Sequence, residues 1–280
     1  MLSWSDNMFD SSIFRFLIGA VIVYVAFVAM LTLLQRRLIY FPDTSRIVPA
    51  STGISGLNAL ELVAADGVRL VAWYRAARPG QPTVLYLHGN AGNIAYRVSK
   101  ARPFLDAGMG VMLLSWRGYG GSDGSPSEQG LYADGRAAAA ELDRLGVTPS
   151  LLALYGESLG AGVAVQLASE RPVAAIVLEA PFTSAVDIGA STYPFVPVRW
   201  LMWDRFDSAS KIERIGAPLL IMHGEHDEVV PVSHGRRLFE MARTPKELVT
   251  FPRGYHNDLD SHGAMRRAVE FIAAAVNKRT

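Results

Sequence analysis

Short apolar runs alternate with amphipathic stretches along most of the chain, which predicts alternating strands and helices. Six of the runs are continuous, as expected of strands buried on both faces. They span residues 83–87, 111–116, 151–155, 173–178, 218–222 and 248–251. The helical stretches that separate them span residues 94–107, 128–145, 159–170, 232–242 and 259–276. With an antiparallel hairpin at 57–74 that turns at Asp66-Gly67, they predict an α/β fold, with a mostly parallel sheet of about eight strands and helices on both faces.

A longer apolar segment lies near the N-terminus. Residues 16–34 form 19 positions without a charge, bounded by Arg15 and Arg36. At about 1.5 Å per residue, such a helix just crosses a hydrocarbon layer of about 30 Å. We therefore expect an N-terminal unit, residues 1–39, that holds a transmembrane anchor, followed by a single catalytic domain at residues 40–280.

Two alternatives to an anchor are a cleaved signal peptide and a buried core helix. The signal peptide fits poorly, because Asp6 and Asp10 precede the apolar segment and no small-residue exit follows it. The flanking arginines weakly favour a single-pass membrane protein with a cytoplasmic catalytic domain. One precedes the segment and three follow it, at positions 36, 37 and 46.

Composition narrows the classes of partner. The net charge is +1 and basic residues cluster in pairs at most, so nothing indicates a nucleic-acid partner. Cysteine is absent, which excludes disulfides, thiolate metal sites and cysteine nucleophiles. The oligomeric state is not indicated by the sequence.

Residues 182–210, which follow the strand predicted at 173–178, break the alternation of strands and helices. They are rich in aromatic residues but show no clear periodicity. We expect either a loop packed on the surface or a short cap-like segment that shapes an apolar pocket. For the second case, Phe195, Trp200 and Trp203 are the candidate pocket residues.

A serine flanked by glycines, in the pattern G-x-S-x-G, occurs twice, at Ser122 and at Ser158. A nucleophilic serine of this pattern needs a sharp turn between a strand and a helix, which lifts the hydroxyl above the sheet. Ser158 meets this condition, because it joins the run at 151–155 to the helical stretch at 159–170. Ser122 lies in a loop with four glycines. We therefore expect Ser158 to be the nucleophile.

A serine nucleophile also needs a base and an acid that orients the base. In this fold class the acid precedes the histidine, and both follow the serine along the chain. Asp227 and His256 lie just after the last two predicted strands, where parallel sheets place their sites. We expect Asp227 to be the acid and His256 the base. The weaker local candidates are Glu179, Glu225 and Glu228 for the acid and His262 for the base.

The oxyanion of an acyl-transfer transition state needs backbone donors. Leu159 N–H, at the start of the helix after Ser158, is the first expected donor. The second is expected from the glycine-bearing loop after the strand at 83–87, with Asn90 N–H preferred over Gly89 or Ala91.

The chain resembles the α/β-hydrolase superfamily in a series of motifs that occur in order. They read YFPD, LYLHGNAGN, SWRGYGGSDGSPSE, GESLGAGVA, APFTS, HGEHDEVVP and YHND. The YFPD segment after an apolar anchor is similar to the membrane-anchored Bem46 group, which includes the abhydrolase-domain 13 and 17 proteins. The resemblance implies a serine hydrolase with Ser158, Asp227 and His256 as its triad and with no metal or organic cofactor. Some relatives remove acyl chains from cysteines of membrane proteins.

At two positions the chain differs from these relatives, at Glu157 before the expected nucleophile and at Ala180 after the strand at 173–178. The substrate of the relatives is therefore not assigned to this chain. We expect hydrolysis of an ester or thioester of a lipophilic acyl group, on a small molecule or an acylated protein near a membrane. A peptidase of the same fold is an alternative, with Glu157, Glu179 or Asp204 as the anchor for a free amine. A non-catalytic membrane-tethered scaffold is a more distant one.

Overall fold

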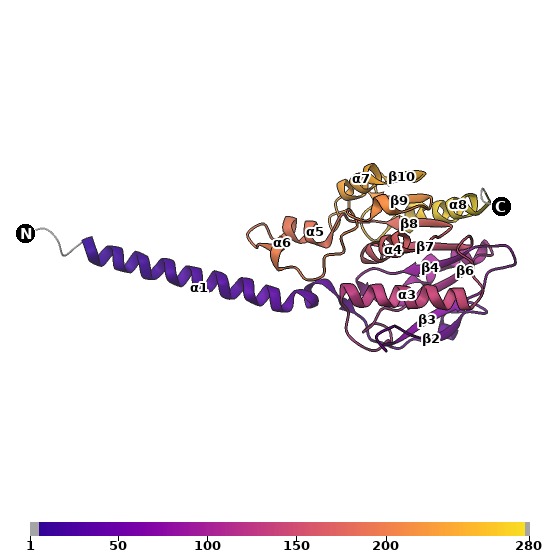
Figure 1. Ribbon diagram of the computed structural model, residues 1–280, viewed down its shortest axis with the longest axis horizontal. Coiled ribbons are helices and arrows are strands. Elements are labelled where there is room, and N and C mark those ends of the chain that lie inside the picture. Colours follow the sequence, from indigo (N-terminus) through magenta and orange to yellow (C-terminus); the bar gives the residue numbers. More distant parts are fainter. Residues whose placement is uncertain (1–5, 278–280) are drawn as a thin grey trace, which may run out of the picture.

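The central sheet of the computed structural model, which describes residues 6–277, has eight strands (Figure 1). Their order across the sheet is β10-β9-β8-β7-β4-β6-β3-β2. The strands are β2 (Asn58–Val63), β3 (Arg69–Arg75), β4 (Thr83–Leu87), β6 (Gly110–Leu114), β7 (Leu152–Glu157), β8 (Ala175–Glu179), β9 (Leu219–Gly224) and β10 (Lys246–Phe251). Only the β2–β3 and β3–β6 pairs of this sheet are antiparallel. The α/β-hydrolase architecture expected from the sequence is confirmed.

Helices cover both faces of this sheet and bury two separate apolar clusters. One face carries α3 (Glu128–Arg144), α4 (Leu159–Glu170) and α7 (Val232–Met241), and the other carries α2 (Val98–Asp106) and α8 (Ala264–Asn277). The strands at the centre are apolar on both sides because both sides are covered: every residue of β4, β6, β7, β8 and β9 is buried. Because β4 and β6 to β10 run parallel to one another, their carboxyl ends meet at one edge of the sheet, where the loops gather.

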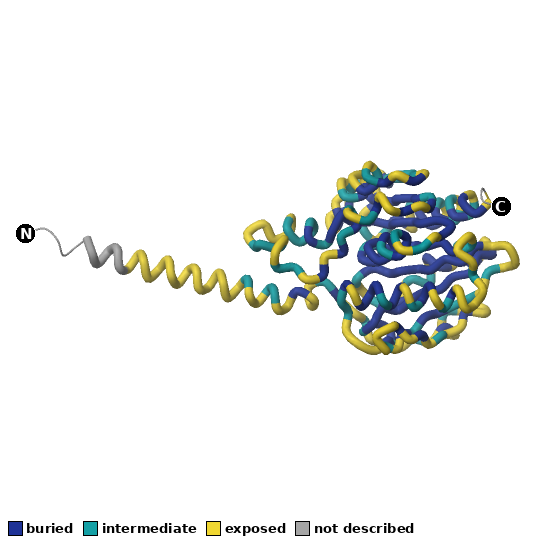
Figure 2. Tube along the Cα trace, in the orientation of Figure 1, coloured by how far each residue is buried: buried dark blue, intermediate teal, exposed yellow. Residues whose placement is uncertain are grey.

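The N-terminal helix α1 (Asp6–Ile39) has 34 residues and projects away from the hydrolase domain (Figure 1). It is longer than the predicted span of 16–34, and at about 1.5 Å per residue it measures about 51 Å. Most of its residues from position 12 onward are exposed (Figure 2). Ser12–Ile39 is long and apolar enough to cross a membrane. Residues 1–5 of the predicted tail lie outside the described residues.

The connector after α1 is more ordered than its composition indicates. Its first residues form β1 (Phe41–Pro42), which pairs in parallel with β5 (Ala91–Gly92) in the loop after β4. Four short 3-10 turns, at Pro49–Thr52, Ile94–Arg97, Ile212–Arg214 and Leu259–His262, complete the loop structure. The residues that directly follow α1 are therefore paired with a loop at the edge of the sheet where the carboxyl ends of the parallel strands meet.

The aromatic-rich segment at 182–210 contains two short helices, α5 (Ala185–Thr192) and α6 (Val198–Leu201). They lie beside the C-terminal part of α1, outside the sheet (Figure 1). We call residues 182–210 the cap.

Candidate active site

Ser158 occupies the sharp turn between β7 and α4. Its backbone has φ 50° and ψ −112°, a left-handed conformation that is rare for a residue with a side chain. The turn closes tightly, because a Cβ on Gly160 would lie 2.0 Å from the carbonyl oxygen of Leu87 and one on Gly156 would lie 2.6 Å from the Cα of Ala161. The two glycines of the motif are thus required by contact with backbone, and the strain at Ser158 holds its hydroxyl away from the sheet.

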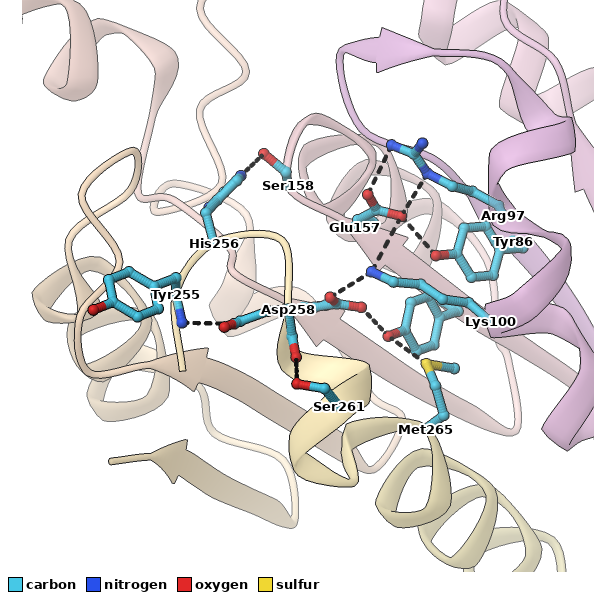
Figure 3. Close-up of polar contacts among 12 residues, drawn as sticks. Tyr86, Arg97, Lys100, Glu157, Ser158, Tyr255, His256, Asp258, Ser261 and Met265 are labelled. Carbon is cyan, nitrogen blue, oxygen red and sulfur yellow. Dashed lines mark hydrogen bonds and ion pairs between the residues drawn. The ribbon is translucent and has the colours of Figure 1, made fainter. Parts of the chain in front are cut away.

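The structure brings Ser158, His256 and Asp227 together, although up to 98 residues separate them along the chain. The Nε2 atom of His256 lies 3.0 Å from Ser158 Oγ (Figure 3), and its Nδ1 atom lies 2.7 Å from Asp227 Oδ2. The other oxygen of Asp227 accepts the backbone N–H groups of Val229 and Val230, at 2.9 and 2.7 Å. These bonds fix the carboxylate, which in turn fixes the imidazole ring.

Asp227 is held in its ionised form. Burial acts to raise the pKa of this carboxyl, but hydrogen bonds from His223 and His256 outweigh burial and lower the pKa below its ordinary value. An ionised Asp227 favours the tautomer of His256 with its proton on Nδ1. That tautomer leaves Nε2 free to accept the proton of the Ser158 hydroxyl.

Most of the weaker candidates for the nucleophile, the acid and the base form contacts outside the triad. Ser122 is buried in its loop, where its hydroxyl donates to Ser115 O and accepts Val71 N–H, both at 2.9 Å. Glu225 pairs with Arg236 at 2.7 Å, and His262 lies 3.5 Å from Asp258. Glu228 is exposed.

A buried charge network, formed by Arg97, Lys100, Glu157 and Glu179, lies behind the nucleophile (Figure 3). Arg97 pairs with Glu157 at 2.9 Å, and Lys100 bridges Glu179 at 2.7 Å and Glu157 at 3.7 Å. Tyr86 donates to Glu157 at 2.6 Å, and Tyr155 donates to Glu179. Ser158 lies next to this network, and its backbone N–H donates to the backbone carbonyl oxygen of Glu179 at 2.8 Å.

Burial acts to raise the pKa of both carboxyls of this network, but their charged neighbours shift the two pKa values in opposite directions. Burial alone would raise the pKa of Glu157, but Lys100 and Arg97 lower that pKa to about 2. Glu179 has its pKa raised, first by burial and further by the neighbouring Glu157. The register of the sheet sets Glu157 of β7 directly beside Glu179 of β8. This pairing of two like charges explains why buried cations are needed here, a requirement that was missed in the sequence.

The expected oxyanion donors lie beside the nucleophile. Leu159 and Asn90 both line the cavity that contains Ser158. Leu159 is the first residue of α4, a position whose N–H has no partner within a helix. Asn90 is held on both sides, since its carbonyl accepts Phe41 N–H at 2.9 Å and its side chain donates to Ile39 O at 2.8 Å.

The loop that carries Asn90 is braced by a neutral histidine, His88. This side chain is buried, and its Nδ1 lies 2.8 Å from Gly89 O. Burial, with the positive charge of Arg97, lowers the pKa of His88 to about 3. His88 is therefore uncharged at neutral pH and packs against Trp116 and Tyr119.

A cavity of about 310 Å³ extends from Ser158 between the cap and α1. Its walls are mostly apolar and come from three parts of the chain. From α1 come Leu31, Thr32, Gln35, Leu38 and Ile39, from the cap come residues such as Phe182, Ile188, Tyr193, Val196, Leu201 and Met202, and from the loop after β9 come Val229 and Val230. The sequence did not predict that α1 contributes to this wall.

The candidate pocket residues Phe195, Trp200 and Trp203 do not line this cavity. All three are exposed on the outside of the cap, at 86%, 87% and 52%. Other residues of the same segment line the cavity instead; most are aliphatic, and two, Phe182 and Tyr193, are aromatic. Aromatic content therefore located the correct segment but the wrong side of it.

Two family models match the chain: residues 82–198 match the alpha/beta hydrolase fold, and residues 203–260 match serine aminopeptidase, S33. The Mycobacterium tuberculosis protein Rv2307c is 43% identical over 227 residues, which cover 80% of this chain and 81% of the relative. Protein bem46 of Schizosaccharomyces pombe is 34% identical and covers 80% of each chain. Among solved structures, the Pyrococcus furiosus esterase Pf2001 superposes with a TM-score of 0.70 at 20% identity, covering 85% of this chain and 99% of that chain.

Proposed function

Because the chain belongs to the α/β-hydrolase family, we propose that it is a serine hydrolase that cleaves carboxylic ester or thioester bonds of a lipophilic acyl substrate. The observation that carries this proposal is the hydrogen-bonded series from Asp227 through His256 to Ser158. Ser158, at the end of this series, lines an apolar cavity. In such a series the carboxylate orients the base, and the base removes the proton of the nucleophile.

In the first half of the reaction, Ser158 Oγ attacks the acyl carbon while His256 Nε2 takes its proton. The carbonyl electron pair moves to the oxygen, which the N–H groups of Leu159 and Asn90 stabilise. The intermediate then collapses, and the leaving alcohol or thiol takes the proton from Nε2. In the second half, water attacks the acyl carbon and gives its proton to Nε2. The intermediate then collapses, Ser158 Oγ leaves and takes that proton back from Nε2, and the carboxylic acid is released.

The nature of the cavity supports a lipophilic acyl group. Its lining is mostly aliphatic, and a volume of about 310 Å³ lies within the range of small-molecule sites. A fatty acyl chain of a small molecule or of an acylated protein fits this description. The apolar helix α1 supports a single-pass membrane anchor, with the catalytic domain on the cytoplasmic side as the flanking arginines favour.

A peptidase is the second candidate, because residues 203–260 match the serine aminopeptidase model. An aminopeptidase needs a carboxylate to hold the free amine of its substrate. Among the described residues that line the cavity, none is Asp or Glu. Glu157, Glu179 and Asp204 instead pair with Arg97, Lys100 and Arg36. This arrangement favours the esterase or thioesterase over the peptidase.

The test compares the full chain in detergent as wild type, Ser158→Ala and Ser122→Ala. Each protein is treated with a fluorophosphonate probe and then assayed with p-nitrophenyl esters of rising chain length and with an aminoacyl p-nitroanilide. We expect only Ser158→Ala to lose labelling, and ester hydrolysis to fall by about 10³-fold or more, because the nucleophile is gone. Absence of labelling in the folded wild type would contradict the proposal, whereas preferred cleavage of the anilide would favour the peptidase.

A further inference from the structure

The C-terminal part of α1 and the cap form one structural unit. Gln35 of α1 is buried, its side-chain carbonyl accepts Trp203 N–H at 2.8 Å, and its amide donates to Leu201 O at 3.3 Å. Arg36 pairs with the buried Asp204 of the cap at 2.9 Å. The helix is therefore fixed against the cap by paired polar groups and is not attached through a flexible linker.

The contact between α1 and the cap reaches into the apolar part of the helix. The hydroxyl of Tyr24 donates to Phe195 O at 2.7 Å. Tyr24 lies within the apolar segment 16–34, and so do the cavity-lining residues Leu31 and Thr32. If this segment crosses the bilayer, the outer edge of the cap and one wall of the cavity lie at the depth of the lipid.

The outer face of the cap has the composition of a membrane interface. Phe195, Trp200 and Trp203 are exposed there, and Arg199 is the only charged residue between positions 193 and 203. The guanidinium of Arg36 lies 5.7 Å from the ring centre of Trp203. Exposed tryptophan and phenylalanine beside arginine are typical of side chains at the level of lipid headgroups.

We propose that this outer cap face, defined by Phe195, Trp200 and Trp203, is embedded in the bilayer, with Trp203 at the level of the headgroups beside Arg36 and Phe195 deeper, beside Tyr24. A membrane acyl chain then enters the cavity between α1 and the cap directly from the leaflet, and its carbonyl reaches Ser158 without the chain crossing water. The substrate class is a lipid or lipidated residue whose acyl chain remains in the leaflet. The entry route rests on the proposed hydrolase function, whereas contact of the cap with lipid does not.

The first experiment measures lipid contact by tryptophan fluorescence, in the full chain carrying Trp4→Phe. The protein is placed in phosphatidylcholine vesicles with or without bromine on the acyl chains near the headgroup. We expect brominated lipid to quench the emission, because bromine quenches tryptophan only on contact. Replacing Trp200 and Trp203 by Phe leaves the core residues Trp73 and Trp116 and should remove most of the quenching. Equal quenching with and without Trp200 and Trp203 would overturn the proposal and would leave a protein partner as the cover of this face.

The second experiment measures entry of substrate. The triple variant Phe195→Ser, Trp200→Ser, Trp203→Ser is compared with Val48→Ser, Val63→Ser, whose two side chains are exposed and belong to the connector and to β2. We expect the triple variant to hydrolyse a long-chain ester carried in vesicles at a rate lower by about tenfold or more, because the acyl chain loses its route from the leaflet. A tenfold change in rate corresponds to about 1.4 kcal/mol. Its hydrolysis of soluble p-nitrophenyl acetate should equal that of the control.

The outcomes of this second experiment separate the two proposals. If wild type and control hydrolyse both esters and the triple variant does so equally well, leaflet entry is overturned. If the wild type hydrolyses neither ester, the hydrolase function fails, and the quenching experiment still decides whether the cap contacts lipid.

Discussion

Ser158 and Glu157 are neighbours in the chain, but their side chains point in opposite directions (Figure 3). Ser158 faces His256, and Glu157 faces Arg97. The two residues therefore separate a hydroxyl that is hydrogen-bonded to an imidazole from a carboxylate whose charge is stabilised by cations. The backbone N–H of Ser158 donates to the backbone carbonyl oxygen of Glu179, so the turn that carries Ser158 is held to the end of β8, next to the charge network.

Lys100 is the residue on which this network depends, since it neutralises both carboxylates. We expect Lys100→Met to destabilise the folded chain by about 3–5 kcal/mol, because it leaves buried carboxylates without their shared cation. The control is Arg136→Met, whose pair with Glu170 is partly exposed and should cost less than about 1 kcal/mol. Thermal unfolding of the full chain in detergent measures both.

The Lys100→Met variant should also acquire a pH dependence of defined sign. With the cation gone, burial and mutual repulsion raise the pKa of a carboxyl in this pair above its unfolded-state value. A raised pKa stabilises the folded state below the unfolded-state pKa, and this contribution is lost as the pH rises through the folded-state pKa. The melting temperature of Lys100→Met, relative to wild type, should therefore fall between pH 5 and pH 8. An unchanged difference would show that neither carboxyl binds a proton in the variant.

At the scale of elements, the loop after β4 couples the catalytic site to α1. The loop pairs with the connector as β5 with β1, and Asn90 donates its side-chain amide to Ile39 O. The backbone of Asn90 is the expected oxyanion donor, so its side chain acts as a positioning group for its own N–H.

Asn90→Ala removes this positioning hydrogen bond and keeps the backbone donor. We expect kcat for a soluble ester to fall by up to about tenfold with little change in KM, since one hydrogen bond is worth about 1 kcal/mol and is used mainly in the transition state. Asn58→Ala is the matched control, because its amide makes a local bond to Gly56 O far from the site. A rise in KM at constant kcat would instead place the Asn90 side chain in ground-state binding.

The elements that have long apolar runs were predictable, and the short ones were not. β4 and α4 match their predicted residues 83–87 and 159–170, because continuous burial and a helix that opens with small residues leave a strong pattern. Two-residue strands such as β1 and β5 leave none, since their pairing depends on distant partners. The cap helices α5 and α6 were missed because they are short, with eight and four residues, and too short a helix shows no clear periodicity.

Some residues of the candidate site were also predictable and others were not. Ser158, Asp227 and His256 each follow a predicted parallel strand, so the alternation of strands and helices predicted that they lie close together. Arg97 and Lys100 were missed, because cations on an amphipathic helix are ordinarily solvated. The signal that would have found them is the occurrence of a glutamate at the end of two successive buried strands. The exposed side of the cap aromatics was missed because composition does not report direction.

At the scale of the whole molecule, α1 and the hydrolase domain form an extended body (Figure 1). The apolar helix stands at one end, and both the helix and the cap line the cavity. Substrate and anchor would then belong to the same membrane.

This geometry predicts hydrolysis in cis. In a mixture of vesicles that carry the full chain and vesicles that do not, a non-exchangeable long-chain ester should be cleaved at least about tenfold faster when it shares the vesicle with the protein, because tethering raises the effective concentration. Vesicles with Ser158→Ala serve as the control for spontaneous hydrolysis. Equal rates for the two populations would contradict access through the leaflet of the anchor.

If the chain hydrolyses acylated proteins, as proposed, the junction after α1 affects which of them it accepts. Tyr40 N–H continues the helix to Arg36 O, and the next bonds already join the connector to the catalytic loop, from Phe41 N–H to Asn90 O and from Asp43 N–H to Gly92 O. These bonds begin directly after the helix, so they hold the loop that carries Asn90, beside Ser158, in place relative to the helix. An anchored protein of this kind would select acylated proteins by how far the modified residue stands from the bilayer, before any side chain around that residue is recognised.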